Sequence, residues 1–215
     1  MKEQNIESSL ITTIVNSEAK EIAFDMVELS LDSVLDDGVL KDIPVIGILA
    51  KLYSTGNTIQ GKIFEKKIIK FLYETEKVKK SSKEKFNQKL ESDPKYKKKV
   101  GEHLLVILDK LDNTEKASVL GRLFKVFMEE IIDLDMFQRL ASVIANGFLP
   151  DLKRLNNYEP QIQWSSFTST SLSNLGLVHR SFVKPEKFDE NGKQLSGSEY
   201  SITKLGIELL NLRVI

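Results

Sequence analysis

The chain has 215 residues, of which 41% are hydrophobic, enough to build one domain with an appendage or two small domains. Lys plus Arg and Asp plus Glu number 31 each, so the formal net charge is zero and no global field recruits a polyanion. Cysteine is absent, which excludes disulfides, thiolate catalysis and thiolate-bound zinc and suits a reducing compartment.

The neutral total conceals two opposed blocks of charge. Residues 1–42 contain ten acidic side chains and three lysines, a net charge of −7. Residues 77–99, called the lysine segment below, contain ten lysines and three acids, a net charge of +7. The two blocks either attract each other within the fold or present separate faces to different partners. Solvated helix faces are the simpler interpretation of both.

The N-terminal residues show no targeting signal, and no stretch of the chain is long and apolar enough to predict a transmembrane helix. Residues 1–9 are polar and acidic and lack the basic start and apolar core of a secretory signal, and we expect residues 1–15 to be flexible. The longest apolar stretch, 43–53, has 11 residues and contains Lys51, whereas a transmembrane helix needs about 20. We therefore expect a soluble, cytoplasmic protein.

The first helical pattern follows this end. Apolar residues spaced three and four apart predict a helix that Asn16 or Ser17 caps and that runs to Leu35. The sequence Asp-Asp-Gly at 36–38 would end it.

A second and a third helix are predicted next. Asp42 and Pro44 give the cap and the first turn of a segment over 43–62 that is rich in small residues. A further apolar stripe predicts a helix over 63–80.

The lysine segment is where we expect a polar hinge, over 81–99. Phe86 and Leu90 predict a short amphipathic helix there, and Asp93-Pro94 is a cap followed by a first turn. The helix that follows passes from lysines to the apolar run 104–108, which should be buried on nearly every side. Lysines in a first turn oppose the helix dipole, which suggests that they serve another purpose.

Two more helices complete the predicted bundle. Asn113 caps the first; Asp133 or Asp135 caps the second, and Gly147 ends it. A short helix should lie between Pro150 and Pro160. Short connections of this kind are typical of antiparallel neighbours in a helical bundle.

The pattern changes after residue 160. Segment 165–176 is rich in Ser and Thr, and 175–182 is a helix end that leads into a strand. A polar loop follows over 184–198, then a second short strand over 200–203 and a final helix over 204–215. The residues that carry this pattern are Leu172, Leu175, Gly176, Leu177, Val178, Tyr200, Ile202, Thr203, Leu205, Gly206 and Leu209. The order resembles the end of winged-helix domains, and the resemblance implies that the hairpin is the wing and that Thr203 caps the closing helix.

The expected fold class is therefore mainly α. A bundle of six to eight helices should occupy residues 1–160, and a small C-terminal winged-helix-like (α+β) module should occupy residues 161–215.

Two further resemblances concern the middle of the chain. Residues 116–148 look like a helix pair of tellurite-resistance TerB-like proteins, which place acidic residues at a shared site. That resemblance implies a candidate acidic site made of Glu129, Glu130, Asp133 and Asp135. The segment 42–47 and the KKIIKFL run after it resemble bacterial proteins of unassigned function, which implies a bacterial or mobile-element origin and no particular activity.

No pattern in the sequence predicts an enzyme. His103 and His179 have no partner at metal-ligand spacing, so no zinc site is expected. The run GNTIQGK at 56–62 approximates a phosphate loop, but Ile63 stands where a Ser or Thr would bind Mg²⁺, and no strand precedes it. We expect no catalytic residue, no cofactor, no metal and no small-molecule substrate.

Three functional classes stay open. The leading hypothesis is a macromolecular-interaction protein that binds a protein partner, because the expected recognition helix 167–175 carries no Lys or Arg. The second is a nucleic-acid-binding regulator that uses the lysine segment and the winged module. The third is a membrane-active effector, of a toxin or phage-defence type, that uses helix 43–59. The candidate nucleic-acid or partner contacts are Lys79, Lys80, Lys83, Lys95, Lys97, Lys98, Lys99, Arg154, Ser173, Asn174 and Arg180.

Overall fold

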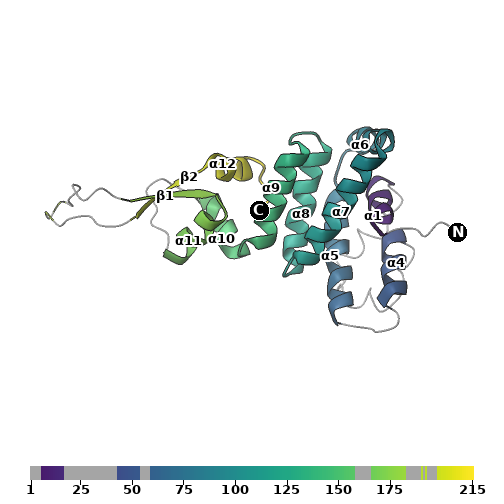
Figure 1. The fold of residues 1–215 in the computed structure, drawn as a ribbon, viewed down its shortest axis with the longest axis horizontal. Helices are drawn as coiled ribbons and strands as arrows, with labels where there is room; N and C mark the ends of the chain where they lie inside the picture. The colour runs from purple at the N-terminus through teal and green to yellow at the C-terminus, as the bar shows by residue number, and fades with distance from the viewer. Residues whose placement is uncertain are drawn as a thin grey trace. The chain divides into compact units, whose positions relative to one another are not determined.

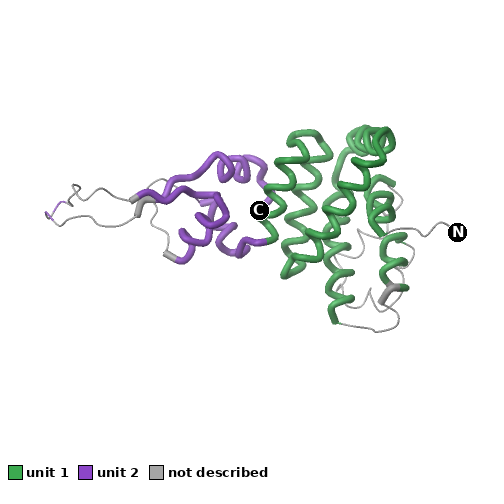
Figure 2. The backbone as a smooth tube through the Cα atoms, in the orientation of Figure 1, with its two compact units in different colours: residues 1–145 green, residues 146–215 purple. Residues whose placement is uncertain are grey.

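The computed structural model describes residues 6–16, 43–53, 59–157, 166–182, 190, 192 and 198–215. The chain divides into two compact units, residues 1–145 and residues 146–215 (Figure 2). The described residues are mainly helical, with a small antiparallel sheet near the C-terminus, which confirms a helical bundle with a small α+β module. The boundary lies before the predicted one at residue 160, because the short helix over residues 149–154 groups with the C-terminal unit.

The first unit is a bundle of helices (Figure 1). In chain order they are α1 (Ile6–Val15), α4 (Pro44–Tyr53), α5 (Ile59–Glu76), α6 (Lys80–Ser92), α7 (Pro94–Lys110), α8 (Thr114–Met128) and α9 (Leu134–Asn146). The most extensive packing joins α5 to α8, and α1 packs on α4 and α7. The predicted helix from Asn16 or Ser17 to Leu35 falls almost wholly on residues outside the described ranges.

An aromatic cluster fills the centre of this unit. Phe124 on α8 lies 5.5 Å from Phe71, 5.7 Å from Phe86 and 5.4 Å from Phe137 between ring centroids, and all four rings are buried. Offset and edge-to-face pairs at these separations add to the burial of the rings. Helices α5, α6, α8 and α9 therefore share one core.

The helix caps predicted for α7, α8 and α9 are confirmed, whereas the predicted cap Asp42 lies outside the described residues. The Asp93 carboxylate accepts hydrogen bonds from the backbone N–H groups of Lys95 and Tyr96, both at 3.0 Å, and Pro94 opens α7. Asn113 accepts from the N–H of Lys116 at 3.0 Å, which caps α8. Of the two acids proposed for α9, the one that caps it is Asp133, whose carboxylate accepts from Met136 N–H at 2.8 Å.

Three expectations about this unit are wrong. Residues 1–15 were expected to be flexible, yet 6–15 form α1, whose Leu10, Ile11 and Ile14 are fully buried. The run 104–108 was expected to be buried on nearly every side, yet Val106 is 52% exposed, because only one face of α7 meets the bundle.

The third correction concerns the expected hinge. Residues 81–99 are helical, as most of α6 and the first turns of α7, with a break only at Asp93. Phe86 and Leu90 of α6 are buried and pack this helix against the bundle. The lysine segment is therefore an integral part of the first unit.

The second unit is small and mixed. Its elements are α10 (Leu149–Arg154), the 3₁₀ helix η3 (Leu155–Asn157), α11 (Ser166–Asn174), β1 (Val178–Phe182), β2 (Ser198–Ile202) and α12 (Lys204–Asn211). The two strands pair antiparallel, with Val178 opposite Ile202 and Arg180 opposite Tyr200. Helix α11 packs on β1 and on α10.

The turn from α11 into β1 and the start of α12 share backbone contacts. Gly176 has a φ of 73°, and the hydrogen bonds from Gly176 N–H to Ser173 O and from Leu177 N–H to Leu172 O, at 2.9 and 3.0 Å, form a Schellman motif. Thr203 caps α12 by accepting from Gly206 N–H at 3.1 Å, and its hydroxyl donates to Gly176 O at 2.7 Å. The cap that the winged-helix resemblance implied is therefore present.

Candidate functional site

Most lysines of the lysine segment are engaged by acidic side chains of the same unit. Lys77 pairs with Glu74 at 2.7 Å, Lys97 with Glu91 at 2.5 Å, and the remaining surface pairs are Lys80–Glu84 at 3.9 Å and Lys98–Glu102 at 3.5 Å. Lys85 and Lys89 both bind Glu130. Surface pairs of this kind contribute little stability, but each one lowers the net positive charge of this surface.

Three candidate contacts of this segment stay unpaired within the described part of the chain: Lys79, Lys95 and Lys99. All three are exposed. Lys95 and Lys99 are four residues apart in the first turns of α7, so they project from the same face. They are the described lysines of this segment that offer free ammonium groups to a partner.

Lys83 lies inside the bundle and does not belong to this surface. Its ammonium group binds Glu76 at 2.9 Å, and both side chains are almost completely buried. A buried ion pair of this kind is isolated from any partner in solution, so Lys83 is a structural residue that links α6 to the end of α5.

The candidate acidic residues have separate roles. Asp133 caps α9, and Asp135 binds Arg139 at 2.7 Å. Glu129 is the C-cap residue of α8, while Glu130 binds lysines of α6. In the part of the chain that the structure describes, no group of His, Cys, Asp or Glu side chains is arranged to hold a metal ion.

Glu130 has an unusual backbone. Its φ is 56°, in the left-handed region that favours glycine, and it is the residue that follows the end of α8 in a Schellman motif. Lys85, first by its hydrogen bond, holds the pKa of the Glu130 carboxyl below its usual value, and Lys89 adds to this. The carboxylate thereby tethers α6 to the turn between α8 and α9.

Tyr96 lies in the same neighbourhood. The ammonium of Lys89 is 5.5 Å from the centre of its ring, and burial, followed by the charge of Glu130, raises the pKa of the phenol. The ring is half-buried, so it is a poor platform for stacking a nucleic-acid base.

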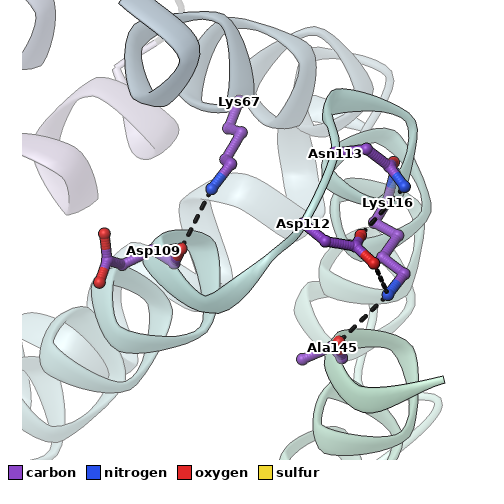
Figure 3. A network of polar contacts seen from close by, with 6 residues as sticks. All are labelled: Lys67, Asp109, Asp112, Asn113, Lys116 and Ala145. Atoms are coloured by element: carbon purple, nitrogen blue, oxygen red, sulfur yellow. Dashed lines mark hydrogen bonds and ion pairs between the residues drawn. The ribbon is translucent and has the colours of Figure 1, made fainter. Parts of the chain in front are cut away.

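Two buried lysines on other helices act as caps for neighbouring helices (Figure 3). The Lys67 ammonium on α5 donates to Asp109 O in the last turn of α7 at 3.0 Å. The Lys116 ammonium on α8 donates to Ala145 O in the last turn of α9 at 3.1 Å and to Asp112 Oδ2 at 3.0 Å. Cations at helix C-termini satisfy orphan carbonyls and complement the dipole.

Burial lowers the pKa of Lys67, and the carboxylates of Asp109 and Asp112 oppose that shift. A lysine with a lowered pKa is a potential nucleophile. However, the side chain is only 6% exposed and its ammonium is hydrogen-bonded to a backbone carbonyl, so a substrate has no access to it. We assign Lys67 a structural role.

His103 lies on α7, and its buried Nε2 atom has no hydrogen-bond partner. The imidazole meets the ring of Phe137 edge-on, 6.0 Å between centroids. Burial, and then the charges of Lys110 and Lys99, lower its pKa below 6.5. The ring is therefore neutral in the fold at physiological pH and acts as part of the core.

A cavity of about 260 Å³ lies between the starts of α1 and α7. It is lined by Glu7, Ser8, Pro94, Lys97 and Lys98. The first-turn N–H groups of α7 are already bonded to Asp93, which leaves them unable to receive an anion. The mixed charge of the walls favours no single class of ligand.

The candidate residues of the second unit belong to two places. Arg154 on α10 donates to Asp151 at 2.9 Å and to the Thr168 hydroxyl on α11 at 2.8 Å, so it ties the two helices together. Ser173, half-buried, and Asn174, exposed, end α11, and Arg180 is exposed on β1.

Two exposed aromatic residues of this unit were not predicted from the sequence. Phe167, in the first turn of α11, is 85% exposed, and Phe148, just before α10, is 61% exposed. Phe167 is five residues before the buried Leu172, which is out of phase with a helical apolar stripe. That mismatch is the signal that could have identified it.

No described helix combines the length and apolar character needed to cross a bilayer. Comparison of the chain with protein-family models, with curated proteins and with solved structures finds no match.

Proposed function

We propose that this chain is a non-enzymatic interaction protein whose C-terminal unit binds a protein partner. The observation that carries this proposal is the exposure of Phe167 and Phe148, two phenylalanines of the same small unit. Aromatic side chains are enriched among the residues that carry most of the binding energy of protein interfaces.

The base of α11 supports the proposal. Thr168, next to Phe167, is buried and accepts from Arg154 while it donates to Asp151 at 2.9 Å. Leu172 anchors the same helix in the unit. Because these contacts fix the helix, little conformational entropy is lost when Phe167 enters a partner's pocket.

The charge of α11 also favours a protein over a nucleic acid. The helix has no basic residue, whereas affinity for nucleic acid depends on neutralised phosphates. If the unit is a winged-helix module, as the resemblance implies, we propose that its recognition helix contacts protein.

Nucleic-acid binding through the lysine segment is the second candidate. Lys79, Lys95 and Lys99 support it, since their ammonium groups are exposed and without an ionic partner among the described residues. The ion pairs of the other lysines reduce the charge available for phosphate contacts, which is why this candidate ranks second.

Partner capture with surface variants tests the leading proposal. Nuclease-treated lysate from the native host is passed over the tagged full chain and over the variant Phe148→Ser/Phe167→Ser, and the captured proteins are quantified by mass spectrometry. The control is Ile131→Ser, because Ile131 is 61% exposed on the first unit. We expect the phenylalanine variant to lose the specific partner by tenfold or more, about 1.4 kcal/mol, and the control to keep it.

Equal capture by the wild type and the phenylalanine variant would overturn the proposal. The second candidate is measured by fluorescence anisotropy with labelled duplex and single-stranded DNA at increasing salt. If it holds, Lys95→Glu/Lys99→Glu weakens binding and lowers the salt slope by about 2.

A further inference from the structure

Helix α11 carries an exposed row of side chains without charge. Phe167, Thr170 and Asn174 follow one another at helical spacings of three and four residues, so they lie on one face of the helix. All three are exposed, whereas Thr168 and Leu172, on the other side of the helix, are buried in the C-terminal unit. We call Phe167, Thr170 and Asn174 the α11 stripe.

The absence of charge distinguishes α11 from the other helices. Among the α-helices of the described residues, α11 alone contains no Lys, Arg, Asp or Glu. The exposed Val106 on α7, by comparison, has Glu102 and Lys110 four residues away on either side. At the base of α11, Arg154 pairs with Asp151 at 2.9 Å, so this contact adds no net charge. An uncharged surface can therefore meet its own copy without bringing like charges together, which would cost binding energy.

The polar groups of the α11 stripe are complementary to themselves. The Thr170 hydroxyl and the Asn174 amide each contain a donor and an acceptor, so each can bond to the same group on another molecule. An ammonium group only donates and a carboxylate only accepts, so neither has this property. In a dimer with two-fold symmetry the same surface of each subunit meets itself. The α11 stripe satisfies this condition with an exposed ring and two groups that both donate and accept.

We propose that the α11 stripe is the contact surface of a homodimer, so that the C-terminal unit binds a second copy of this chain. This inference rests on the proposed function, because it specifies the partner that Phe167 contacts. The ring of each Phe167 packs on the stripe of the other chain, and the hydroxyl and amide groups bond around it. A standard interface buries about 800 Å² on each partner, more than one helix of nine residues offers. We therefore expect a reversible dimer with a dissociation constant in the micromolar range.

Analytical ultracentrifugation of the purified full chain tests this proposal. The wild type, Phe167→Ser and the matched control Val106→Ser are sedimented at concentrations from about 1 µM to about 200 µM, at low and at high salt. We expect the wild type and the control to pass from monomer to dimer over this range. Salt should change their dissociation constants little, because the contact holds no ion pair. Phe167→Ser should raise the dissociation constant by about tenfold or more.

A charge exchange at Thr170 tests whether the stripe meets its own copy. Thr170→Lys and Thr170→Glu should each weaken the dimer, because each variant brings like charges into the contact. An equal mixture of the two should associate more tightly than either variant does alone, and this association should weaken at high salt. A variant that had merely lost its fold would not be rescued by mixing.

The proposal fails if the wild type stays monomeric over the whole range, if Phe167→Ser dimerises as the wild type does, or if the Thr170 mixture associates no better than its components. These failures are separable from failure of the proposed function. If the chain is monomeric while Phe148→Ser/Phe167→Ser loses a different protein from the lysate, the partner is not a second copy and the protein-binding proposal stands. If the chain is monomeric and capture from the lysate is also unchanged in that variant, both proposals fail.

Discussion

The side chain of Lys83 shows how burial changes what a lysine does in this fold. Seven residues separate it from Glu76, and the two form an ion pair that water does not reach. The exposed pair Lys80–Glu84, on the same helix, is made of the same groups. Removing one member of a buried pair leaves an uncompensated charge, whereas removing one member of an exposed pair leaves a solvated one.

We therefore expect Lys83→Met to lower the free energy of unfolding by about 3–5 kcal/mol, because the buried Glu76 carboxyl would lose its cationic partner. The double variant Lys83→Met/Glu76→Leu should recover most of that loss, since no charge is left in the interior. Denaturant unfolding of the full chain gives both values. Lys80→Met is the control and should change stability by no more than about 0.5 kcal/mol. A loss for Lys83→Met no larger than that of the control would contradict the assignment.

His103 should make the fold sensitive to acid. Its pKa is lowered in the fold, so the folded state binds fewer protons than the unfolded state wherever the pH lies between the folded pKa and 6.5. The free energy of unfolding is therefore expected to fall as the pH drops below 6.5, and to be unaffected by this group well above it. In His103→Gln the slope of stability against pH between about pH 7 and pH 5 should be smaller.

The control for this measurement is His179→Gln, since His179 is exposed on β1. That variant should keep the wild-type slope. Identical slopes for His103→Gln and the wild type would show that the acid sensitivity comes from other groups.

At the scale of the elements, the contact between α5 and α8 depends on Gly121. A Cβ atom at this position would lie 2.7 Å from the Cβ of Glu74 and 2.7 Å from the carbonyl oxygen of Phe71. Both neighbours belong to the helix α5 itself, so the two helices would have to separate to admit a methyl group.

We expect Gly121→Ala to destabilise the fold by about 1–3 kcal/mol, although alanine is the better helix former. Gly101 offers a graded comparison, because its added Cβ would meet Glu7 Cβ at 3.0 Å and is less crowded. Gly101→Ala should cost less than Gly121→Ala in thermal or denaturant unfolding. The reverse order would show that the α1–α7 contact is the tighter one.

The elements that the sequence predicted correctly are those with local signals. The sequence predicted Asp93 and Asn113 as caps, and Asp133 as one of two candidates, because a cap is formed by a side chain and a backbone group two or three residues away. Thr203 is likewise a local cap, whose hydroxyl accepts from the backbone N–H three residues later at the start of α12.

The elements and residues that the sequence did not predict depend on tertiary contacts. Six of the ten residues of α1 are β-branched, which weakens a helical prediction, and the helix is held by packing against α7 near Gly101. Lys83 was counted among the exposed lysines because its burial depends on the turn that brings Glu76 back to α6. Phe167 was overlooked because exposure is decided by the fold.

At the scale of the whole molecule, the chain divides into two compact units at residues 145 and 146. We expect the two units to open separately in native-state hydrogen exchange. Gly121→Ala should raise amide exchange in α5 and α8 and leave α12 and β1 unchanged. Gly176→Ala, which forces a side chain into a left-handed backbone at a cost of about 1–2 kcal/mol, should do the opposite. Equal acceleration in both units by either variant would indicate one cooperative structure.

The burial of Lys67, Lys83 and Lys116 divides the amines of this chain into two chemical populations. An acylating reagent should modify the exposed Lys79, Lys95 and Lys99 quickly, while the three buried amines react only after the bundle opens. Peptide mapping of the modified chain would thus follow the integrity of the first unit through reactivity alone. The same three amines would be the last that a lysine-modifying enzyme could reach, so acetylation there would mark a chain that had already unfolded.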